Sequence, residues 1–244
     1  MSSDPICRRL EWDSAHFGVG IGRYLPRRLD GRSMQAAANW CRAESVQCLY
    51  LLLEASDPET VRAAEAWGGS FVDVRLTLER TTVESPSVPP VPSVRPHHDL
   101  DLPALKAIAR QSHGGTRFYR DGRLSRDACD ALYEIWIERS TRQAGTMVLV
   151  GGDPVSGYVT CEPAASGGGR IGLFAVASAQ RGRGLGAALL AGALGWFASH
   201  DVHPIEVVTQ GLDPRPLRVY ERAGFVTRSV ELWYHLWFEG RGKK

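Results

Sequence analysis

The sequence has 244 residues, of which 43% are hydrophobic, and this suits a cored globular protein of one large or two small domains. A formal net charge of only +2 argues against a dedicated nucleic-acid-binding protein. The five cysteines show no CxxC spacing and the histidines no metal-ligand spacing, so we expect reduced thiols and no metal. The polar N-terminus predicts no signal peptide, and no apolar run approaches a membrane span, which favours a cytoplasmic protein without a membrane partner.

Residues 1–80 alternate between predicted helices and strands. Apolar runs at 46–54 and 71–78 predict strands, and helical patterns around 33–45 and 58–67 lie between and before them. This order predicts an α/β half-domain over residues 1–80.

A proline- and serine-rich segment, residues 81–96, favours an extended linker and divides the chain. Residues 97–244 are then the second domain. A glycine and a phenylalanine precede a strand in both parts, at Gly69–Phe71 and Gly224–Phe225. The first part is therefore either a degenerate copy of the second or an unrelated half-domain with a similar short pattern.

Aromatic and basic side chains meet in the segment that follows a predicted helix at 102–111. Such side chains stack on nucleobases and neutralise phosphate. The alternative is a loop whose aromatic rings cover Tyr133 and Trp136 of the next helix. The candidate substrate-binding residues are Arg117, Phe118, Tyr119 and Arg120.

The segment 172–198 predicts an apolar strand, a glycine- and arginine-rich loop, and a helix, in that order. Glycines let the loop backbone approach a ligand closely, and the free N–H groups at the start of the helix attract negative charge. Several donors converge over a few residues, which suits a pyrophosphate. The loop also fits a loose GxGxxA dinucleotide pattern, but the strand does not lead directly into it as that fingerprint requires.

Three further elements follow: a strand at 205–209, a short helix at 217–225 that carries Tyr220, and a final strand at 226–237. Arg181-x-x-Gly184-x-Gly186 resembles the pyrophosphate loop of the GCN5-related N-acetyltransferases (GNAT family), and the elements after it follow that family's order. The resemblance implies a mixed α/β GNAT fold, with residues 97–244 as the catalytic domain and a partial GNAT-like half-domain before it.

The resemblance also implies that acetyl-CoA is the cosubstrate. Asp213 stands where the family commonly has Asn, which alters the hydrogen bonds available there. The residues implied to bind acetyl-CoA are Leu173, Phe174, Ala175, Val176, Arg181, Gly182, Arg183, Gly184, Leu185, Gly186, Ala187, Asp213, Leu217 and Arg222.

Direct acetyl transfer needs an amine that loses a proton, a donor for the oxyanion and a proton for the departing thiolate. A phenol can supply that proton while it is neutral at working pH, so Tyr220 is the candidate general acid. A backbone N–H at a bulge in the strand Leu173–Val176 is the implied oxyanion donor. Either core packing or this chemistry accounts for a tyrosine there.

Three segments, at 10–18, 116–121 and 132–140, resemble the members of the family that act on sugar nucleotides. The resemblance implies a TDP-linked 4-amino-dideoxyhexose as acceptor and places an acidic residue at Asp73, as catalytic group for the amine. Pairing of Asp73 with Arg75 on a solvent-facing strand is the alternative.

The sequence thus predicts an acetyl-CoA-dependent N-acetyltransferase that acts on the amino group of a small-molecule sugar nucleotide. Two alternatives stay open: acetylation of an aminoglycoside, small amine or protein N-terminus, and a CoA-binding module without turnover. Pairing of final strands between two copies would give a homodimer.

Overall fold

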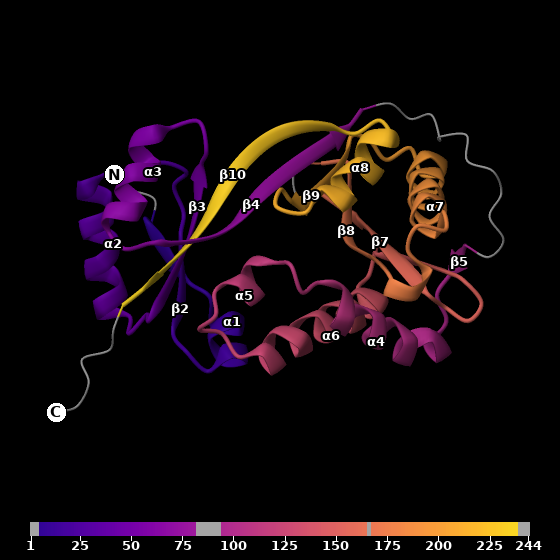
Figure 1. Ribbon diagram of the computed structural model, residues 1–244, viewed down its shortest axis with the longest axis horizontal. Helices are drawn as coiled ribbons and strands as arrows, with labels where there is room; N and C mark the ends of the chain where they lie inside the picture. Colours follow the sequence, from indigo (N-terminus) through magenta and orange to yellow (C-terminus); the bar gives the residue numbers. More distant parts are fainter. Residues whose placement is uncertain (1–4, 82–93, 165–166, 239–244) are drawn as a thin grey trace. The chain divides into compact units, whose positions relative to one another are not determined.

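The computed structural model describes residues 5–81, 94–164 and 167–238, which form two compact units (Figure 1). Unit 1 contains the described residues of Met1–Arg75, Thr116–Ala128 and Val230–Lys244, and unit 2 those of Leu76–Gly115 and Cys129–Ser229. The units are therefore not consecutive in sequence. This differs from the predicted division into 1–80 and 97–244, because two later segments join the N-terminal one.

Unit 1 is a sheet with helices in the chain order β1 (Cys7–Arg9), α1 (Glu11–Phe17), β2 (Ile21–Tyr24), α2 (Gly31–Ala43), β3 (Cys48–Glu54), α3 (Pro58–Ala66), the first part of β4 (Ser70–Arg80), α5 (Arg117–Arg120) and the second part of β10 (Val226–Trp237). Its strand order is β1–β2–β3–β10–β4, with β2 and β3 parallel and β3 and β10 antiparallel. In this described part of the chain, β10 has a neighbour on each side. It offers no open edge for the homodimer pairing that the sequence suggested.

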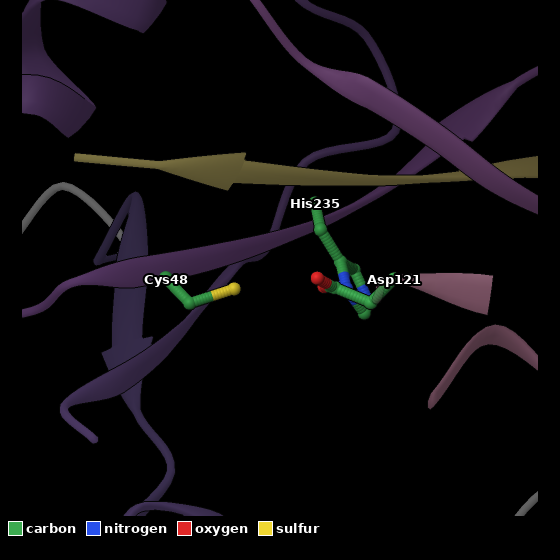
Figure 2. Close-up of side chains that lie close together, drawn as sticks. All are labelled: Cys48, Asp121 and His235. Carbon is green, nitrogen blue, oxygen red and sulfur yellow. The ribbon is translucent and has the colours of Figure 1, made fainter. Parts of the chain in front are cut away.

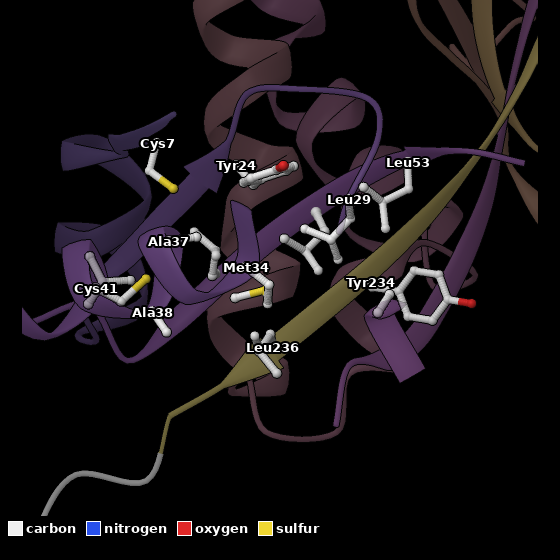
Figure 3. Close-up of a cluster of buried hydrophobic side chains, with 14 residues drawn as sticks. Cys7, Tyr24, Leu29, Met34, Ala37, Ala38, Cys41, Leu53, Tyr234 and Leu236 are labelled. Atoms are coloured by element: carbon white, nitrogen blue, oxygen red, sulfur yellow. The ribbon is translucent and has the colours of Figure 1, made fainter. Parts of the chain in front are cut away.

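The core of unit 1 lies between its sheet and the helices α2 and α3. Side chains alternate along a strand, so Leu49 and Leu51 of β3 share one face with Tyr234 and Leu236 of β10. Figure 3 shows this cluster, in which Met34 of α2 lies against the sheet. The opposite face of the same strands carries polar and aromatic side chains, which belong to the candidate site below.

Unit 2 contains, in chain order, the second part of β4, β5 (Arg95–Pro96), η1 (Asp99–Asp101), α4 (Leu102–Ser112), most of α6 (Arg126–Arg142), β6 (Met147–Gly151), β7 (Gly157–Pro163), β8 (Gly169–Val176), η2 (Ser178–Gln180), α7 (Leu185–Ser199), β9 (Ile205–Gln210), α8 (Pro214–Arg222) and the first part of β10. The strand order is β9–β8–β7–β6–β5, and only β8 and β9 are parallel among these pairs. The predicted linker ends in β5, which pairs with β6, and residues 82–93 of it lie outside the described residues.

Helices α4 and α7 cover opposite faces of the strands of unit 2. At Gly157 of β7, a Cβ atom would lie 2.8 Å from Leu189 of α7, so this position faces α7. The next residue, Tyr158, faces the other way, and its hydroxyl lies 3.1 Å from the ring of His113 at the end of α4. Unit 2 therefore has a helix–sheet–helix arrangement that surrounds β7 and β8.

Two helices begin earlier than the periodicity of the sequence predicted. Helix α2 begins at Gly31 rather than near residue 33, because Asp30 caps it by accepting the Ser33 N–H at 2.7 Å. Helix α8 begins at Pro214 rather than at residue 217, because Asp213 caps it and proline suits a first helical position. None of the helices in the described ranges combines the length and hydrophobicity that a membrane span needs.

Candidate functional site

Strands β8 and β9 of unit 2 diverge after a short paired stretch. Gly169–Ile171 pairs with Ile205–Val207, whereas β8 continues to Val176 and β9 to Gln210. Their facing backbone groups have no ladder partner on the other strand beyond that stretch. Unpaired N–H and C=O groups between splayed strands are a ready binding surface for a ligand that forms backbone hydrogen bonds.

A β-bulge lies in β8 close to this divergence. The register with β7 shifts at Thr160, which faces both Gly172 and Leu173. The Leu173 N–H donates to the Thr160 hydroxyl at 2.8 Å rather than to a strand carbonyl. The bulge falls at the start of the segment where the sequence implied one, and it redirects the backbone of the following residues.

A buried polar network holds this bulge. The Thr160 hydroxyl donates to the Glu162 carboxylate at 3.1 Å, and Arg170 donates to the other oxygen of Glu162 at 2.6 Å. A Cβ atom at Gly172 would overlap the Glu162 carboxylate and the Thr160 hydroxyl, so a larger residue there would displace this network. Three side chains from β7 and β8 therefore fix one irregular turn of backbone.

The loop between η2 and α7 presents backbone N–H groups to solvent. Gly182 and Gly184 have φ values of 76° and 87°, in the left-handed region that favours glycine. The first intrahelical bond runs from the Ala188 N–H to the Gly184 carbonyl, and no side chain caps the helix. The N–H groups of residues 185–187 therefore lack intrahelical acceptors and lie at the positive end of α7, where an anion is favoured.

Two arginines flank these N–H groups. Arg181 is held against the end of β8, because its Nε donates to the Val176 carbonyl at 2.9 Å. Arg183 lies on the exposed part of the loop. Gly186 faces β8, with Phe174 and Val176 in van der Waals range of a Cβ placed there. The structure thus brings the loop, the helix start and the end of β8 together, as a pyrophosphate site requires.

Tyr220 of α8 lies beside the bulged strand. Its ring is 4% exposed and packs edge-on to Phe174 and Phe225, with ring centroids 6.0 and 5.6 Å away. Burial raises the pKa of the Tyr220 phenol, so the group holds its proton at neutral pH. No hydrogen bond joins its hydroxyl to another residue of the described ranges, which leaves the proton available.

Asp213 has a local structural role at the start of α8. It accepts the Arg215 N–H at 3.0 Å and pairs with the Arg215 guanidinium at 2.8 Å. This pairing lowers the pKa of the Asp213 carboxyl. Leu217 is half-buried and Arg222 exposed on the same helix, and their contacts with a cosubstrate stay predictions.

Asp73, on the part of β4 that belongs to unit 1, is a buried carboxyl group with 3% exposure. It accepts the Val74 N–H at 2.9 Å, and burial raises its pKa to about 6. Positive charge on Arg117 and Arg120 acts in the opposite direction. The alternative of a surface pair with Arg75 is wrong, because Asp73 is buried and Arg75 pairs with Glu231 at 3.4 Å.

The Arg117 side chain is enclosed by aromatic rings of unit 1. Its guanidinium carbon lies 4.1 Å from the Tyr50 centroid, 4.0 Å from that of Phe118 and 4.3 Å from that of Trp233. Its Nη1 lies 2.8 Å from Nε2 of His235. Arg117 is therefore a cation held in one orientation by cation–π contacts and a hydrogen bond.

The other candidate residues of this segment differ from one another. Phe118 is 4% exposed and packs on Phe17 and Tyr50, so the expectation that it stacks on a nucleobase is wrong: its ring belongs to the core. Tyr119 is half-buried and contacts Arg126, whereas Arg120 is exposed. Short helical geometry explains the difference, because neighbouring side chains on a helix point to different sides.

His235 links Arg117 to a buried carboxylate, a relationship that the sequence did not reveal. Arginine only donates hydrogen bonds, so Nε2 of His235 accepts from Arg117 and its Nδ1 carries the proton that it donates to Asp121. Figure 2 shows the ring of His235 and the Asp121 carboxylate pointing toward each other. Trp237 donates to the same carboxylate at 3.1 Å. Burial lowers the pKa of His235 to about 4, which keeps it neutral.

Cys48 lies near this pair, and its sulfur and ligand atoms of Asp121 and His235 are all within 4.8 Å of one another (Figure 2). The geometry alone resembles a three-ligand metal site. However, the Arg117 guanidinium already occupies Nε2 of His235, and burial raises the pKa of the Cys48 thiol. A cation beside the cluster and a protonated thiol do not fit a metal ion.

Comparison with known proteins agrees with the geometry of unit 2. Residues 107–225 match the acetyltransferase (GNAT) family. In solved structures the fold recurs in a GCN5-related N-acetyltransferase from Sphaerobacter thermophilus, with a TM-score of 0.66 and 18% identity over 94% of this chain and 75% of that one. A tandem GNAT protein from the clavulanic acid biosynthesis pathway has a TM-score of 0.59 and 17% identity over 89% of this chain and 75% of its own.

Two characterised relatives are more similar in sequence. The chain is 27% identical to dTDP-fucosamine acetyltransferase of Escherichia coli, over 93% of this chain and 96% of that protein. It is 28% identical to the spore coat polysaccharide biosynthesis protein SpsD of Bacillus subtilis, over 68% of this chain and 58% of that protein. The similarity to the first relative therefore includes the segments of unit 1.

Proposed function

Since the chain carries an acetyltransferase (GNAT) domain and is an acetyl-CoA-dependent N-acetyltransferase, we propose that its acceptor is the amino group of a nucleotide-linked amino sugar. The observation that carries the proposal is the similarity to dTDP-fucosamine acetyltransferase over 93% of this chain. That similarity covers unit 1, which lies largely outside the matched family domain. The buried carboxyl group and the enclosed arginine of unit 1 support a role in acceptor binding.

The cosubstrate site of this proposal is the loop and helix start of unit 2. The uncapped N–H groups of residues 185–187 and the side chains of Arg181 and Arg183 hold the pyrophosphate of acetyl-CoA. The splayed end of β8 forms backbone hydrogen bonds to the remainder of the molecule, along Leu173–Val176. When bound, acetyl-CoA supplies an activated thioester.

Tyr220 is the proposed general acid. Its raised pKa keeps the phenol protonated, and its place beside Phe174 of the bulged strand puts it next to the proposed thioester position. The hydroxyl gives its proton to the sulfur as the thiolate departs. The bulge fixed by Thr160 presents the backbone donor for the oxyanion.

Asp73 is the proposed residue for the acceptor amine. With a pKa raised to about 6, the carboxyl group is ionised at neutral pH and is more basic than an ordinary aspartate. It holds the ammonium form of the sugar and accepts its proton through water before transfer. Low exposure strengthens that attraction, because little water screens it.

Release of CoA thiol tests the proposal directly. Acetyl-CoA is supplied with dTDP-linked 3-amino and 4-amino dideoxysugars, and with aminoglycosides and polyamines in parallel reactions. Saturable turnover with one dTDP-amino sugar is the expected result. Turnover only with nucleotide-free amines would contradict the acceptor class and leave the acetyltransferase activity intact.

A further inference from the structure

A group of arginines gathers on the face of the unit 1 sheet opposite to α2 and α3. Arg23 of β2 is paired in register with Tyr50 of β3, so their side chains share that face. Trp233 of β10 is paired with Leu52 and lies on the same face. The guanidinium carbon of Arg23 is 4.6 Å from the centroid of the Trp233 ring.

Arg23 has no counter-ion within the part of unit 1 that the structure describes. No ion pair or hydrogen bond joins its side chain to another described residue, and its Nε is buried without a partner. A buried N–H group that forms no hydrogen bond is costly, because it loses its water without gaining an acceptor. The face of the Trp233 ring stabilises the Arg23 cation in part, but it supplies no negative charge.

Further cations surround Arg23. Burial and then the charges of Arg117, Arg75, Arg27 and Arg8 lower its pKa to about 10. Arg117 contacts the same tryptophan ring, at 4.3 Å from its centroid. Like charges that converge on one half-buried guanidinium destabilise the fold when no anion is bound.

The carboxylates on this face do not neutralise Arg23. Glu231 pairs with Arg27 and Arg75. Asp13 is half-buried, and burial raises its pKa although the charges of Arg117, His16 and Arg23 act against the shift. Within the described residues, Arg23 therefore forms no ion pair with a carboxylate of this face.

We propose that Arg23 and Arg117, aligned by Trp233 and supported by Arg75, bind the diphosphate of the nucleotide-linked acceptor. The inference rests on the proposed function and assigns the phosphate-binding residues of its acceptor. Planar guanidinium groups bind phosphate oxygens in a bidentate way, and His235 holds Arg117 in place for this contact. Arg117 also acts on Asp73, so one cation connects the diphosphate site with the amine site.

Calorimetric titration of the full-length protein with dTDP tests the site without turnover. We expect Arg23→Gln to weaken dTDP binding at least about tenfold, as the loss of a charge-assisted hydrogen bond to phosphate does. Arg62→Gln is the matched control, because Arg62 is an exposed arginine of α3. Inorganic pyrophosphate should compete with dTDP, and thymidine should not.

Thermal unfolding shows whether a loss of dTDP binding in Arg23→Gln comes from the binding site or from a folding defect. Removal of an unpaired, crowded cation should raise the melting temperature of Arg23→Gln while dTDP binding falls. A lower melting temperature, or dTDP binding equal to that of Arg62→Gln, would overturn the site. If the sugar nucleotides are acetylated with an unchanged KM in Arg23→Gln, the proposed function stands and this inference fails.

Discussion

The backbone N–H of Leu173 donates to the side-chain hydroxyl of Thr160 at 2.8 Å, where a regular ladder would supply a carbonyl. The same hydroxyl donates to Glu162, so one buried atom joins the bulge of β8 to a charged pair. Thr160 is therefore the residue that joins the irregular backbone beside the proposed thioester position to the Glu162–Arg170 pair.

Thr160→Val should destabilise the protein and slow turnover. It leaves the Leu173 N–H without an acceptor and one oxygen of the Glu162 carboxylate without its donor, which costs about 1–3 kcal/mol of unfolding free energy. Urea unfolding measures the stability, and CoA release measures kcat. Thr160→Ser keeps the hydroxyl and should retain most of both. Equal kcat in the valine and serine variants would show that the bulge does not contribute to catalysis.

Tyr220→Phe should lower kcat about 100-fold or more, which is the usual contribution of a general acid, with little change in acetyl-CoA affinity. Tyr158→Phe is the control, because Tyr158 is also a buried tyrosine of unit 2, with its hydroxyl bound to His113. Steady-state kinetics and acetyl-CoA titration measure the two quantities. A Tyr220→Phe enzyme as fast as Tyr158→Phe would assign the proton to another donor.

Asp73→Asn should change the pH dependence of catalysis. The pKa of Asp73 is raised to about 6, so in the wild type kcat/KM should fall as the pH drops through 6 and the carboxylate is protonated. The asparagine variant should be slower and should lack this acid limb. If the limb persists with the same midpoint, a different group controls it.

Asp73→Asn, which should slow catalysis, should stabilise the fold at neutral pH. The folded-state pKa exceeds the unfolded value near 3.9, so the stabilisation from proton binding is complete below about pH 4 and is lost as the pH rises through about 6. Above pH 6 the wild type carries a buried carboxylate, and Asp73→Asn should unfold at a higher temperature. Below pH 4 the difference between the two proteins should shrink. Melting curves from pH 3.5 to 8 check this.

His235→Ala should destabilise the protein by about 3 kcal/mol, because it removes the acceptor of Arg117 and one buried donor of the Asp121 carboxylate. Urea unfolding measures the loss, and His200→Ala provides an exposed-histidine control on the end of α7. Since Arg117 occupies Nε2 of His235, treatment of the wild type with EDTA or zinc should leave its unfolding midpoint unchanged. A zinc-dependent increase would show that the cluster with Cys48 binds metal.

The parts of the molecule that sequence reasoning predicted are those with local signals. Periodicity placed most helices and strands within a few residues, and the glycines with a following apolar helix located the loop at 181–187. Helix caps were harder to predict. The sequence placed the start of α8 at residue 217, whereas Asp213 caps it and Pro214 begins it. The helices, the strands and the loop at 181–187 could be predicted because each depends on residues that are close together in the sequence.

Long-range relationships were not predictable from one sequence. Asp121 and His235 lie in different parts of the chain, and no spacing rule connects them. The aromatic character of Phe118 suggested a base-stacking surface, whereas Tyr50 and Phe17 cover its ring. The sequence did not indicate a role for Arg23. That role depends on arginines and a tryptophan from other parts of the chain, which the fold places beside it.

The pairing of β3 with β10 also has a consequence for how the protein is made. Glu54 pairs with Glu231, so the ribosome must synthesise the whole intervening chain before β3 gains this neighbour. At about 5–20 residues per second, that takes roughly 10–35 s. During this time an apolar strand with an unpaired edge is exposed to other nascent chains. The sheet of the N-terminal segment therefore cannot be completed until almost the whole chain has left the ribosome.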